Sequence, residues 1–471
     1  MDGYCMNRCW IIGLWCAGAV TAAGAADLSE VYQRALAADP TMQQAEYTHL
    51  AARENKTQAI LALLPLNAYL SKTWTGINGP GGEGPEAPST YIPATGNLAV
   101  QVNLFSWSNW IALKQADHTV AQAEASYLAA EEDLISRVTQ RYFAVLSAQD
   151  DLESQQSALE SAQRQLDQAE KRYEVGLIAV TDVETARAQR DTYNASVIAG
   201  KRTVLSAEDQ LRAITDENYD VLAAPRDELP LLRPDPASED SWVTTALSQN
   251  PTLVANELAA DIAHDNYLTA IGGHLPTITA GASRAWALQP NPSLSAFQEV
   301  ESGGGLQITD TQDVLWQINI TVPIFTAGAT QSKVRQAKLT WQAAKAGYQA
   351  QLRATEESAR DAYQGVISQI AQVQALHQAV ASNQVAMNSI ESGYEVGTKT
   401  AVDVLTARQT LVLAQSNYAD AKYAYLNNIV ALRLAAGNLD RKTIDELNGW
   451  LAAQQVLPPS VTAPVAPPAA E

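Results

Sequence analysis

The chain has 471 residues, and its 31 Lys and Arg against 51 Asp and Glu give a formal net charge of −20. This balance excludes nucleic acid as a partner, because contacts to phosphates need clustered Lys and Arg. Hydrophobic residues make up 46% of the chain and charged residues only 17%, which excludes a disordered polyelectrolyte.

Residues 1–25 are predicted to be a secretory signal peptide. One basic residue, Arg8, precedes an apolar run, and small residues with an Ala23-Gly24-Ala25 cleavage pattern follow it. The run is too short for a permanent membrane anchor. All three cysteines lie in this segment, so the mature chain is expected to use no disulfides. No other stretch holds eighteen consecutive apolar residues, so insertion into a membrane would require a closed β-barrel.

The mature chain contains two copies of one unit. Tyr173-Glu174-Val175-Gly176 recurs 221 positions later, and Asp39-Pro40-Thr41 recurs 211 positions later as Asn250-Pro251-Thr252. Matches at such regular offsets indicate an internal duplication. The predicted parts are a first repeat at 26–217, a Pro-rich linker at 218–239, a second repeat at 240–437, a short segment at 438–457 and a disordered tail at 458–471.

Each repeat is predicted to have the same elements in the same order. They are a helical stretch (27–63; 240–274), a strand (66–78; 277–289), a turn-rich loop (79–97; 290–313), a second strand, a long helix (108–174; 327–395) and a last helix (181–216; 402–437). A helix of about 67 residues would extend about 100 Å, which no globular domain needs.

Large apolar residues recur at every seventh position of both long helices, which indicates a left-handed coiled coil. Residues three positions further on are often small or polar, which suits helices packed side by side in a wall. The two stripes are Val138, Val145, Leu152, Leu159, Leu166 and Tyr173, and Val366, Val373, Val380, Met387 and Tyr394.

The strands alternate in polarity. Val100, Val102 and Leu104 oppose Gln101 and Asn103, and residues 314–324 alternate in the same way. Strands of about ten residues with this pattern are typical of a membrane barrel that faces lipid outside and water inside. Four strands cannot close such a barrel, because the smallest have eight, so the barrel must be shared between subunits.

Aromatic residues lie near the strand ends, as expected for the girdles of a membrane interface. The partner strands are less regular, because Lys72 and Arg284 share a face with Trp74 and Trp286. The four interfacial candidates are Trp74, Trp107, Trp110 and Trp286.

From about Asp27 to Trp450 the sequence resembles the TolC-type outer-membrane efflux proteins. The most specific matches are the segments 175–183 and 393–405, which contain Val-Gly-Leu-Ile-Ala-Val-Thr-Asp-Val and Gly-Tyr-Glu-Val-Gly-Thr-Lys-Thr-Ala-Val-Asp-Val-Leu. The resemblance implies an α+β membrane protein that forms a homotrimer. Four strands per subunit would form one 12-stranded outer-membrane β-barrel, continuous with a long periplasmic α-helical coiled-coil barrel.

The same resemblance implies an exit duct in the outer membrane of a Gram-negative bacterium, serving tripartite efflux or type I secretion. Its partners would be a periplasmic adaptor protein, an inner-membrane pump of the ABC or RND type, and the surrounding lipid. No phosphate loop, H-E-x-x-H or G-x-S-x-G motif occurs, and the five His are scattered, so no enzymatic activity, cofactor or metal site is expected.

By the match to the family, the loops at 175–182 and 396–403 would form a gated aperture at the end of the subunit farthest from the strands. Asp403 matches a pore-facing position, where threefold symmetry would place three carboxylates around the axis and favour cations. Alternatively, Asp403 only caps the helix that follows it, and the two roles are compatible.

Gate bonds, by the same match, would join Tyr394 and Lys399 of an inner coil to Thr181 and Asp182 of an outer coil. An exposed Lys–Asp pair is worth little energy, so the adaptor or pump could break it. The alternatives are structural: residues 181–184 fit a capping box, and Tyr394 continues the seven-residue stripe.

The two turns would dock the adaptor, although a glycine that ends a helix also suits a simple C-cap. The docking candidates are Val175, Gly176 and Leu177 in the first repeat and Val396, Gly397 and Thr398 in the second.

Two positions depart from the best-known members of the family. Thr406 stands where they carry a second acidic residue, so one acidic ring is expected instead of two. Lys399 stands where they carry Arg, which loses bidentate geometry. The main rival interpretation is a structural coiled-coil surface protein without transport activity, which would need neither amphipathic strands nor a repeated aperture loop.

Overall fold

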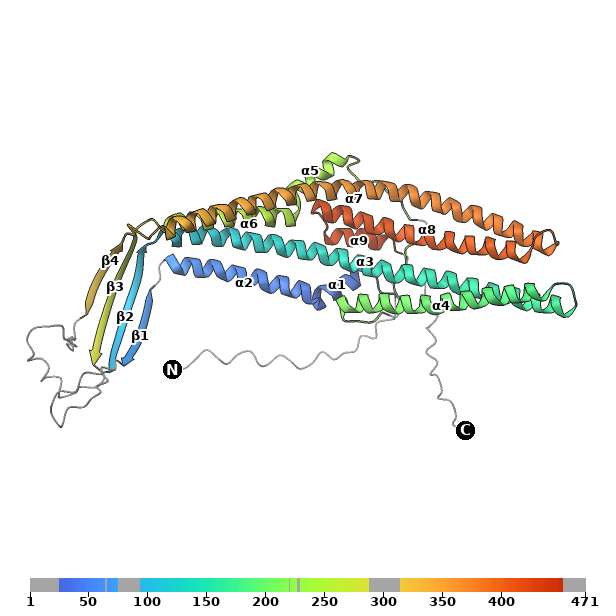
Figure 1. The fold of residues 1–471 in the computed structure, drawn as a ribbon, viewed down its shortest axis with the longest axis horizontal. Coiled ribbons are helices and arrows are strands. Elements are labelled where there is room, and N and C mark those ends of the chain that lie inside the picture. The colour runs from blue at the N-terminus through green and yellow to red at the C-terminus, as the bar shows by residue number, and fades with distance from the viewer. Residues whose placement is uncertain are drawn as a thin grey trace, which may run out of the picture. The chain divides into compact units, whose positions relative to one another are not determined.

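A computed structural model describes residues 25–63, 66–74, 94–219, 221–226, 229–287 and 314–451. The predicted signal peptide up to residue 24, most of the first hairpin loop, all of the second and the predicted disordered tail lie outside these residues. In chain order (Figure 1) the elements are α1 (Leu28–Ala38), α2 (Pro40–Leu63), β1 (Asn67–Trp74), β2 (Ala94–Phe105), α3 (Trp107–Glu174), α4 (Val180–Thr215), α5 (Glu239–Gln249), α6 (Pro251–Gly272), β3 (Thr277–Ala287), β4 (Leu315–Thr321), α7 (Ala329–Glu395), α8 (Ala401–Ala436) and α9 (Arg441–Gly449).

Each predicted helical stretch at the start of a repeat is in fact two helices. The breaks fall at Asp39-Pro40 and Asn250-Pro251, because proline disfavours helical backbone in the residue before it. Asp39 and Asn250 instead have extended backbone, and each side chain accepts the third amide of the next helix, that of Met42 or Leu253.

A second difference concerns the loop predicted at 79–97. Strand β2 already begins at Ala94, so residues 94–97 belong to the sheet.

The elements gather into two compact units, each of which takes parts of both sequence repeats. Unit 1 consists of residues 1–43, 131–242 and 359–471, and unit 2 of 44–130 and 243–358. The long helices α3 and α7 contribute to both units. The predicted domain boundaries follow the duplication of the sequence and stay a prediction.

Unit 2 contains an antiparallel sheet with the strand order β1-β2-β3-β4. The register separates its side chains by polarity. We call one side the apolar face, and its members include Ala68, Leu70, Leu98, Val100, Val102, Ile278, Ala280, Ala282, Trp316, Ile318 and Ile320. The other side, the polar face, carries Asn67, Ser71, Asn97, Gln101, Asn103, Thr277, Thr279, Ser283, Gln317, Asn319 and Thr321.

The predicted alternation of the strands is therefore confirmed, with one adjustment. A bulge between Asn103 and Phe105 brings Phe105 opposite Ile278, so the regular pattern of β2 ends before Leu104. Several members of the apolar face are widely exposed in the single chain, including Leu70 at 71% and Trp316 at 80%. So large an exposed apolar surface indicates contact with lipid or protein.

The helices of unit 2 are tied together close to the sheet. The Trp107 indole donates to the Leu268 carbonyl of α6 at 3.1 Å, and the Asn109 amide donates to the Ala62 carbonyl of α2 at 2.7 Å. A Cβ on Gly272 would lie 2.4 Å from the Trp107 ring, so this glycine lets α6 approach the ring. Further along, Lys114 of α3 pairs at 3.0 Å with the fully buried Asp265 of α6.

The seven-residue stripes form much of the core of unit 1. Val138 and Val145 of α3 are at most 1% exposed, and Val366 and Val373 of α7 at most 3%. The stripe becomes exposed towards the end of α3, where Tyr173 is 48% exposed. Helices α3 and α7 therefore pack tightly along most of unit 1, and side chains near their C-terminal ends are exposed to solvent.

Two buried tyrosines form hydrogen bonds with the backbone of the linker at 218–239 in unit 1. The Tyr142 hydroxyl lies 2.7 Å from the Ala223 carbonyl and 3.1 Å from that of Ala26, beside a parallel bridge between Ala26 and Leu222. The Tyr425 hydroxyl accepts from the Leu232 amide at 2.8 Å. These bonds satisfy backbone groups of an irregular segment, which helices alone cannot do.

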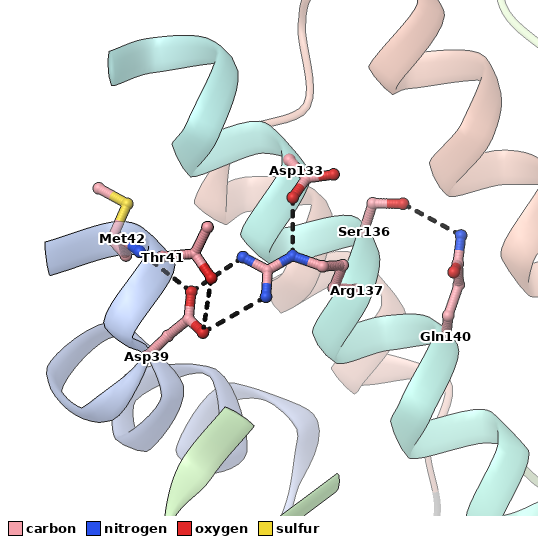
Figure 2. A network of polar contacts seen from close by, with 7 residues as sticks. All are labelled: Asp39, Thr41, Met42, Asp133, Ser136, Arg137 and Gln140. Atoms are coloured by element: carbon pink, nitrogen blue, oxygen red, sulfur yellow. Dashed lines mark hydrogen bonds and ion pairs between the residues drawn. The ribbon is translucent and has the colours of Figure 1, made fainter. Parts of the chain in front are cut away.

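The break between α1 and α2 is held by an ion pair whose carboxylate, that of Asp39, is buried (Figure 2). Arg137 of α3 contacts both carboxylate oxygens of Asp39, at 2.9 and 3.4 Å, and its Nε donates to Asp133 at 2.7 Å. Asp39 is only 3% exposed, and burial alone would raise its pKa. The Arg137 guanidinium, with the Met42 amide and the Thr41 hydroxyl, instead holds the pKa of Asp39 below its ordinary value.

Replacing Arg137 is expected to destabilise this junction. Arg137→Ala leaves the buried Asp39 carboxylate without its cation, which should cost about 2–3 kcal/mol of unfolding free energy. Asp133→Ala removes only the exposed partner of Arg137, and a loss below about 0.5 kcal/mol is expected. Thermal unfolding in detergent, with hydrogen exchange of the amides at 40–43, measures both changes.

The second repeat supplies a rescue variant, because Asn250 fills the corresponding cap without a charge. Asp39→Asn in the Arg137→Ala background should recover part of the lost stability. Equal losses for Arg137→Ala and Asp133→Ala would contradict the central role given to the buried pair.

Candidate functional site

Two similar turns in unit 1 connect α3 to α4 and α7 to α8. In the first, the Gly176 amide bonds to the Tyr173 carbonyl at 2.8 Å and the Leu177 amide to that of Arg172 at 2.9 Å. In the second, the amides of Gly397 and Thr398 bond in the same way to Tyr394 and Gly393, at 3.1 and 2.8 Å. This pair of backbone hydrogen bonds defines the Schellman C-cap, so the C-cap interpretation of both glycines is confirmed.

The glycines are required by their backbone conformation and not by close neighbours. Gly176 and Gly397 have φ of +73° and +80°, and a Cβ on either would meet nothing within 4 Å. The residues around them extend into solvent: Val175, Leu177 and Val396 are 69%, 73% and 75% exposed. Exposed apolar side chains at a turn are suited to contact another protein.

Beneath the turns, the two helical hairpins repeat the same packing at an offset of 221 residues. An ion pair between Arg187 and Glu170 at 3.2 Å recurs between Arg408 and Glu391 at 3.5 Å. The apolar clusters correspond as well; they consist of Leu166, Ala169, Val183 and Ala186 with Ile178 in one hairpin, and of Met387, Val404 and Leu411 with Ile390, Tyr394 and Ala407 in the other.

The starts of α4 and α8 differ. Thr400 and Asp403 form a complete capping box: the Thr400 hydroxyl oxygen accepts from the Asp403 amide, and the Asp403 carboxylate accepts from the Thr400 amide at 2.9 Å. The capping role considered for Asp403 is therefore confirmed. The alternative capping box at residues 181–184 is wrong, because α4 begins at Val180 with Ala179 as its uncapped N-cap residue.

Asp403 keeps its negative charge well into acidic conditions. The Thr400 amide and the Thr400 hydroxyl donate to the carboxylate, and these bonds, with the nearby Lys399 charge, hold the pKa of Asp403 below its ordinary value. Both Thr400 donors bond to the same oxygen of the Asp403 carboxylate, Oδ2. The neighbouring Thr406 hydroxyl donates to the Val402 carbonyl at 2.9 Å, so it is engaged by its own helix.

The gate candidates are not bonded to one another. Within the described part of this single chain, no hydrogen bond or ion pair joins Tyr394 or Lys399 to Thr181 or Asp182. The Arg172 guanidinium of α3 instead lies 5.0 Å from the centre of the Tyr394 ring, a cation–π contact between the two hairpins. The sequence analysis missed Arg172, which precedes the repeated Tyr-Glu-Val-Gly motif.

In the first repeat the cation near the turn, Arg172, precedes it, and in the second repeat the cation, Lys399, follows it. Arg172 of the first repeat corresponds to Gly393 of the second, and Ile178 of the first corresponds to Lys399. A Cβ on Gly393 would lie 2.8 Å from Cγ of Lys399, so the glycine leaves room for the Lys399 stem. Aligning the two repeats at their offset of 221 residues could have shown these two differences in the sequence.

A polar seam, which we define as the contacts of Ser147, Asp150 and Asp151 of α3 with Ser416, Asp420 and Tyr423 of α8, joins the hairpins further from the turns. Tyr423 donates to Asp150 at 2.7 Å and Ser416 donates to Asp151 at 2.5 Å. Burial raises the pKa of both carboxyls against the effect of these bonds. The sequence analysis missed this seam, although two adjacent aspartates inside an apolar stripe were a signal.

The interfacial tryptophan candidates divide into two pairs. Trp107 and Trp110 lie in the first turn of α3; the Trp107 indole is bonded to α6, and Trp110 is 57% exposed. Trp74 occupies the last register position of β1, opposite Ala94, and Trp286 occupies the last but one of β3, opposite Gly96. Their side chains lie outside what the structure describes, and the interfacial role of all four stays a prediction.

Residues 31–216 and 242–438 match the family model described as outer membrane efflux protein. The chain belongs to the outer membrane efflux protein family. It is therefore an efflux channel of the bacterial outer membrane, and the predicted family, function and localisation are confirmed. The family is one of efflux proteins and not of enzymes.

Relatives of the outer membrane efflux protein family span nearly the whole chain. Outer membrane protein TolC of Vibrio cholerae is 31% identical over 431 residues, which cover 92% of this chain and 95% of TolC. The alkaline protease secretion protein AprF of Pseudomonas aeruginosa is 24% identical and covers 93% of this chain and 89% of AprF. The crystal structure of the outer membrane protein VceC from Vibrio cholerae superposes with a TM-score of 0.69 at 20% identity, covering 87% and 96% of the chains. This likeness confirms the predicted fold class for the single subunit, and the trimeric assembly stays a prediction.

Two features are absent from the described residues. None of their helices combines the length and the apolar character that a membrane span requires. They also contain no cluster of three or more His, Cys, Asp or Glu that could hold a metal ion.

The missing cap of α4 can be restored from the second repeat. Ala179→Thr reproduces Thr400, and Asp182 already stands where Asp403 completes the box, so α4 should gain about 1 kcal/mol at its N-terminus. Hydrogen exchange of the amides at 181–183 should slow severalfold. Thr400→Ala is the matched opposite change and should speed exchange at 402–404, while unchanged exchange in both variants would contradict the assignment of the caps.

Proposed function

We propose that three copies of this chain form one channel, in which their twelve strands close a barrel in the outer membrane and their long helices form a duct into the periplasm. The observation that carries this proposal is the sheet of unit 2. It has an apolar face and a polar face, and β1 and β4 stand at its edges. In a membrane those edges need partners, because unpaired backbone groups in lipid cost several kcal/mol each.

The duct would connect an inner-membrane pump and a periplasmic adaptor to the exterior, without catalysing a reaction. Relatives bear names of different processes, such as protease secretion for AprF and cation efflux for CusC. This range supports a duct whose cargo is chosen by the pump. The exposed turn residues Val175, Leu177, Val396 and Thr398, with Gly176 and Gly397 setting their backbone, are proposed to dock the adaptor.

The gate is proposed to consist of Tyr394 and Lys399 acting on Thr181 and Asp182 of a neighbouring subunit. Two observations support this assignment. The four residues lie at the two turns of one chain without bonding to each other there, and Arg172 orients the Tyr394 ring by its cation–π contact. Lys399 is exposed and follows the turn directly, so its ammonium group can reach beyond its own hairpin.

Opening of this gate can be measured as single-channel conductance in planar bilayers. Tyr394→Phe/Lys399→Ala should raise a low resting conductance severalfold, because it removes the hydroxyl and the ammonium donors. Arg172→Ala should produce a smaller rise, since an exposed cation–π contact is worth about 0.5–1 kcal/mol.

The first repeat offers matched controls for these variants. Tyr173→Phe alters the residue that corresponds to Tyr394, and Lys171→Ala removes an exposed lysine near the same turn; neither should change conductance. A large conductance that is the same in all variants would refute the gate but keep the duct. A folded protein that gives no conductance would favour the structural coiled-coil interpretation.

Asp403 is proposed to form an acidic ring at the aperture. Divalent cations added from the helical side should block the channel, and Asp403→Asn should weaken the block at least tenfold, while Glu174→Gln should not. Because the pKa of Asp403 lies below its ordinary value, the carboxylate stays charged from pH 7 to pH 5, and the block should persist over this range. Block that is lost by pH 5 would assign it to another group.

A further inference from the structure

A furrow runs along β3 on the apolar face of the sheet. Its floor consists of Ala280 and Ala282, and Gly281 between them contributes only backbone. The register places larger residues of the neighbouring strands directly beside this floor. They form two walls, Val100 and Val102 on β2 and Trp316 and Ile318 on β4. Together these residues line a hollow of about 590 Å³, within the roughly 300–1,000 Å³ of small-ligand sites.

The furrow is narrow, and its floor is bounded at both ends. Its walls stand on β2 and β4, whose backbones lie two strand spacings, or roughly 10 Å, apart. Every second residue of β3 is on the apolar face, so Ile278 and Arg284 mark the ends of the floor. These two residues are roughly 20 Å apart along the strand. One leaflet of membrane hydrocarbon is about 15 Å deep, so this length matches an extended acyl chain.

The two ends of the furrow differ in chemistry. Ile278, towards α6, is apolar, whereas Arg284, towards the second hairpin loop, is an exposed cation. Among the described residues no hydrogen bond or ion pair engages the Arg284 guanidinium. Lys72, two strands away on β1, has a partner of its own and is not part of the furrow. A ligand that matches the furrow therefore has an apolar chain and an anionic group at one end.

In the proposed barrel the cationic end of the furrow would lie towards the membrane surface. The 11 residues of β3 would extend roughly 26 Å along a barrel axis at a tilt of about 40°, close to the height of the apolar band of a membrane barrel. Arg284 is the eighth of these residues, so it lies beyond the middle of the band. A cation that faces lipid is costly at the midplane and costs little near the interface, where the headgroups lie.

We propose that the furrow binds one acyl chain of a phosphorylated lipid, whose phosphate pairs with Arg284. This inference rests on the proposed function, because that function turns the apolar face towards lipid. The guanidinium can pair with two phosphate oxygens at once through parallel N–H groups. The alanine floor and the two walls contact the chain from three sides, so the chain gains more dispersion contacts than it would on a flat apolar surface.

Binding of diphosphoryl lipid A to the purified, detergent-solubilised protein, counted by native mass spectrometry, tests the furrow. Ala280→Leu/Ala282→Leu fills the floor with side chains and should weaken binding roughly tenfold or more. Ala68→Leu is the matched control, because it adds a leucine to the same face on β1, outside the furrow, and it should leave binding within about twofold of wild type. Equal binding by both variants and wild type would overturn the furrow.

The phosphate contact is tested separately at Arg284. Arg284→Gln should weaken binding of diphosphoryl lipid A about fivefold and leave binding of enzymatically dephosphorylated lipid A within about twofold of wild type. Arg284→Lys keeps the charge and should retain most of the binding. Arg353→Gln, which removes an exposed cation from α7, should change neither lipid's binding.

Two results would overturn parts of the assignment. An equal effect of Arg284→Gln on both lipids would overturn the contact with phosphate. Displacement of lipid A by millimolar inorganic phosphate would identify a general phosphate site and overturn the role given to the acyl chain. The Arg284 variants remain informative if the leucine variants fold poorly, because a neutral residue on a lipid-facing surface is favoured over a charged one.

The conductance of the same preparations separates this inference from the proposed function. Wild type and Ala280→Leu/Ala282→Leu should conduct equally, because the furrow lies on the face directed away from the duct. Conducting channels with equal lipid A affinity in both would overturn the lipid site and leave the duct intact. Protein that binds lipid A through the furrow but never conducts would overturn the duct and keep the site.

Discussion

Backbone hydrogen bonding in lipid is the constraint on which the rest of the molecule depends. A four-stranded antiparallel sheet satisfies its inner strands and leaves one edge of β1 and one edge of β4 for other strands. With an apolar face on one side and amides and hydroxyls on the other, such a sheet would need both edges paired in lipid, as the proposed barrel would provide. The duplication fits this demand, because each repeat contributes one hairpin and the two hairpins pair through β2 and β3.

Repetition preserves the packing of the helical hairpins while the turns diverge. The Glu170–Arg187 and Glu391–Arg408 pairs, and the clusters beside them, recur at matching positions of the two hairpins. The differences gather at the ends, where Gly393 and Lys399 replace Arg172 and Ile178, and where only α8 has a capping box. A ring of such subunits would present two kinds of hairpin end, and only the α7–α8 end carries Tyr394, Lys399 and the acidic group of Asp403.

Patterns that repeat along the chain were sufficient to predict much of this fold. Seven-residue spacing identified the buried stripes of α3 and α7, and alternation identified the two faces of the sheet. Contacts between elements far apart in sequence were not predictable, because they depend on which faces meet. The Asp39–Arg137 pair, the Arg172–Tyr394 contact and the polar seam are of this kind. The capping box expected at 181–184 was wrong for a local reason: α4 begins too early for Thr181 to cap it.

The contacts between hairpins differ in character from those within them. Inside each hairpin, apolar clusters and a repeated ion pair resist separation. Between α3 and α8 the polar seam relies on buried hydrogen bonds to carboxylates, aided by Val412 packing against the cluster of Ala158, Ala162 and Tyr193. Hydrogen bonds can be exchanged for water at little net cost, whereas separating an apolar cluster exposes its whole surface. The proposed opening would therefore move the α7–α8 hairpin as one body against α3, and this movement would separate the Arg172 guanidinium from the Tyr394 ring.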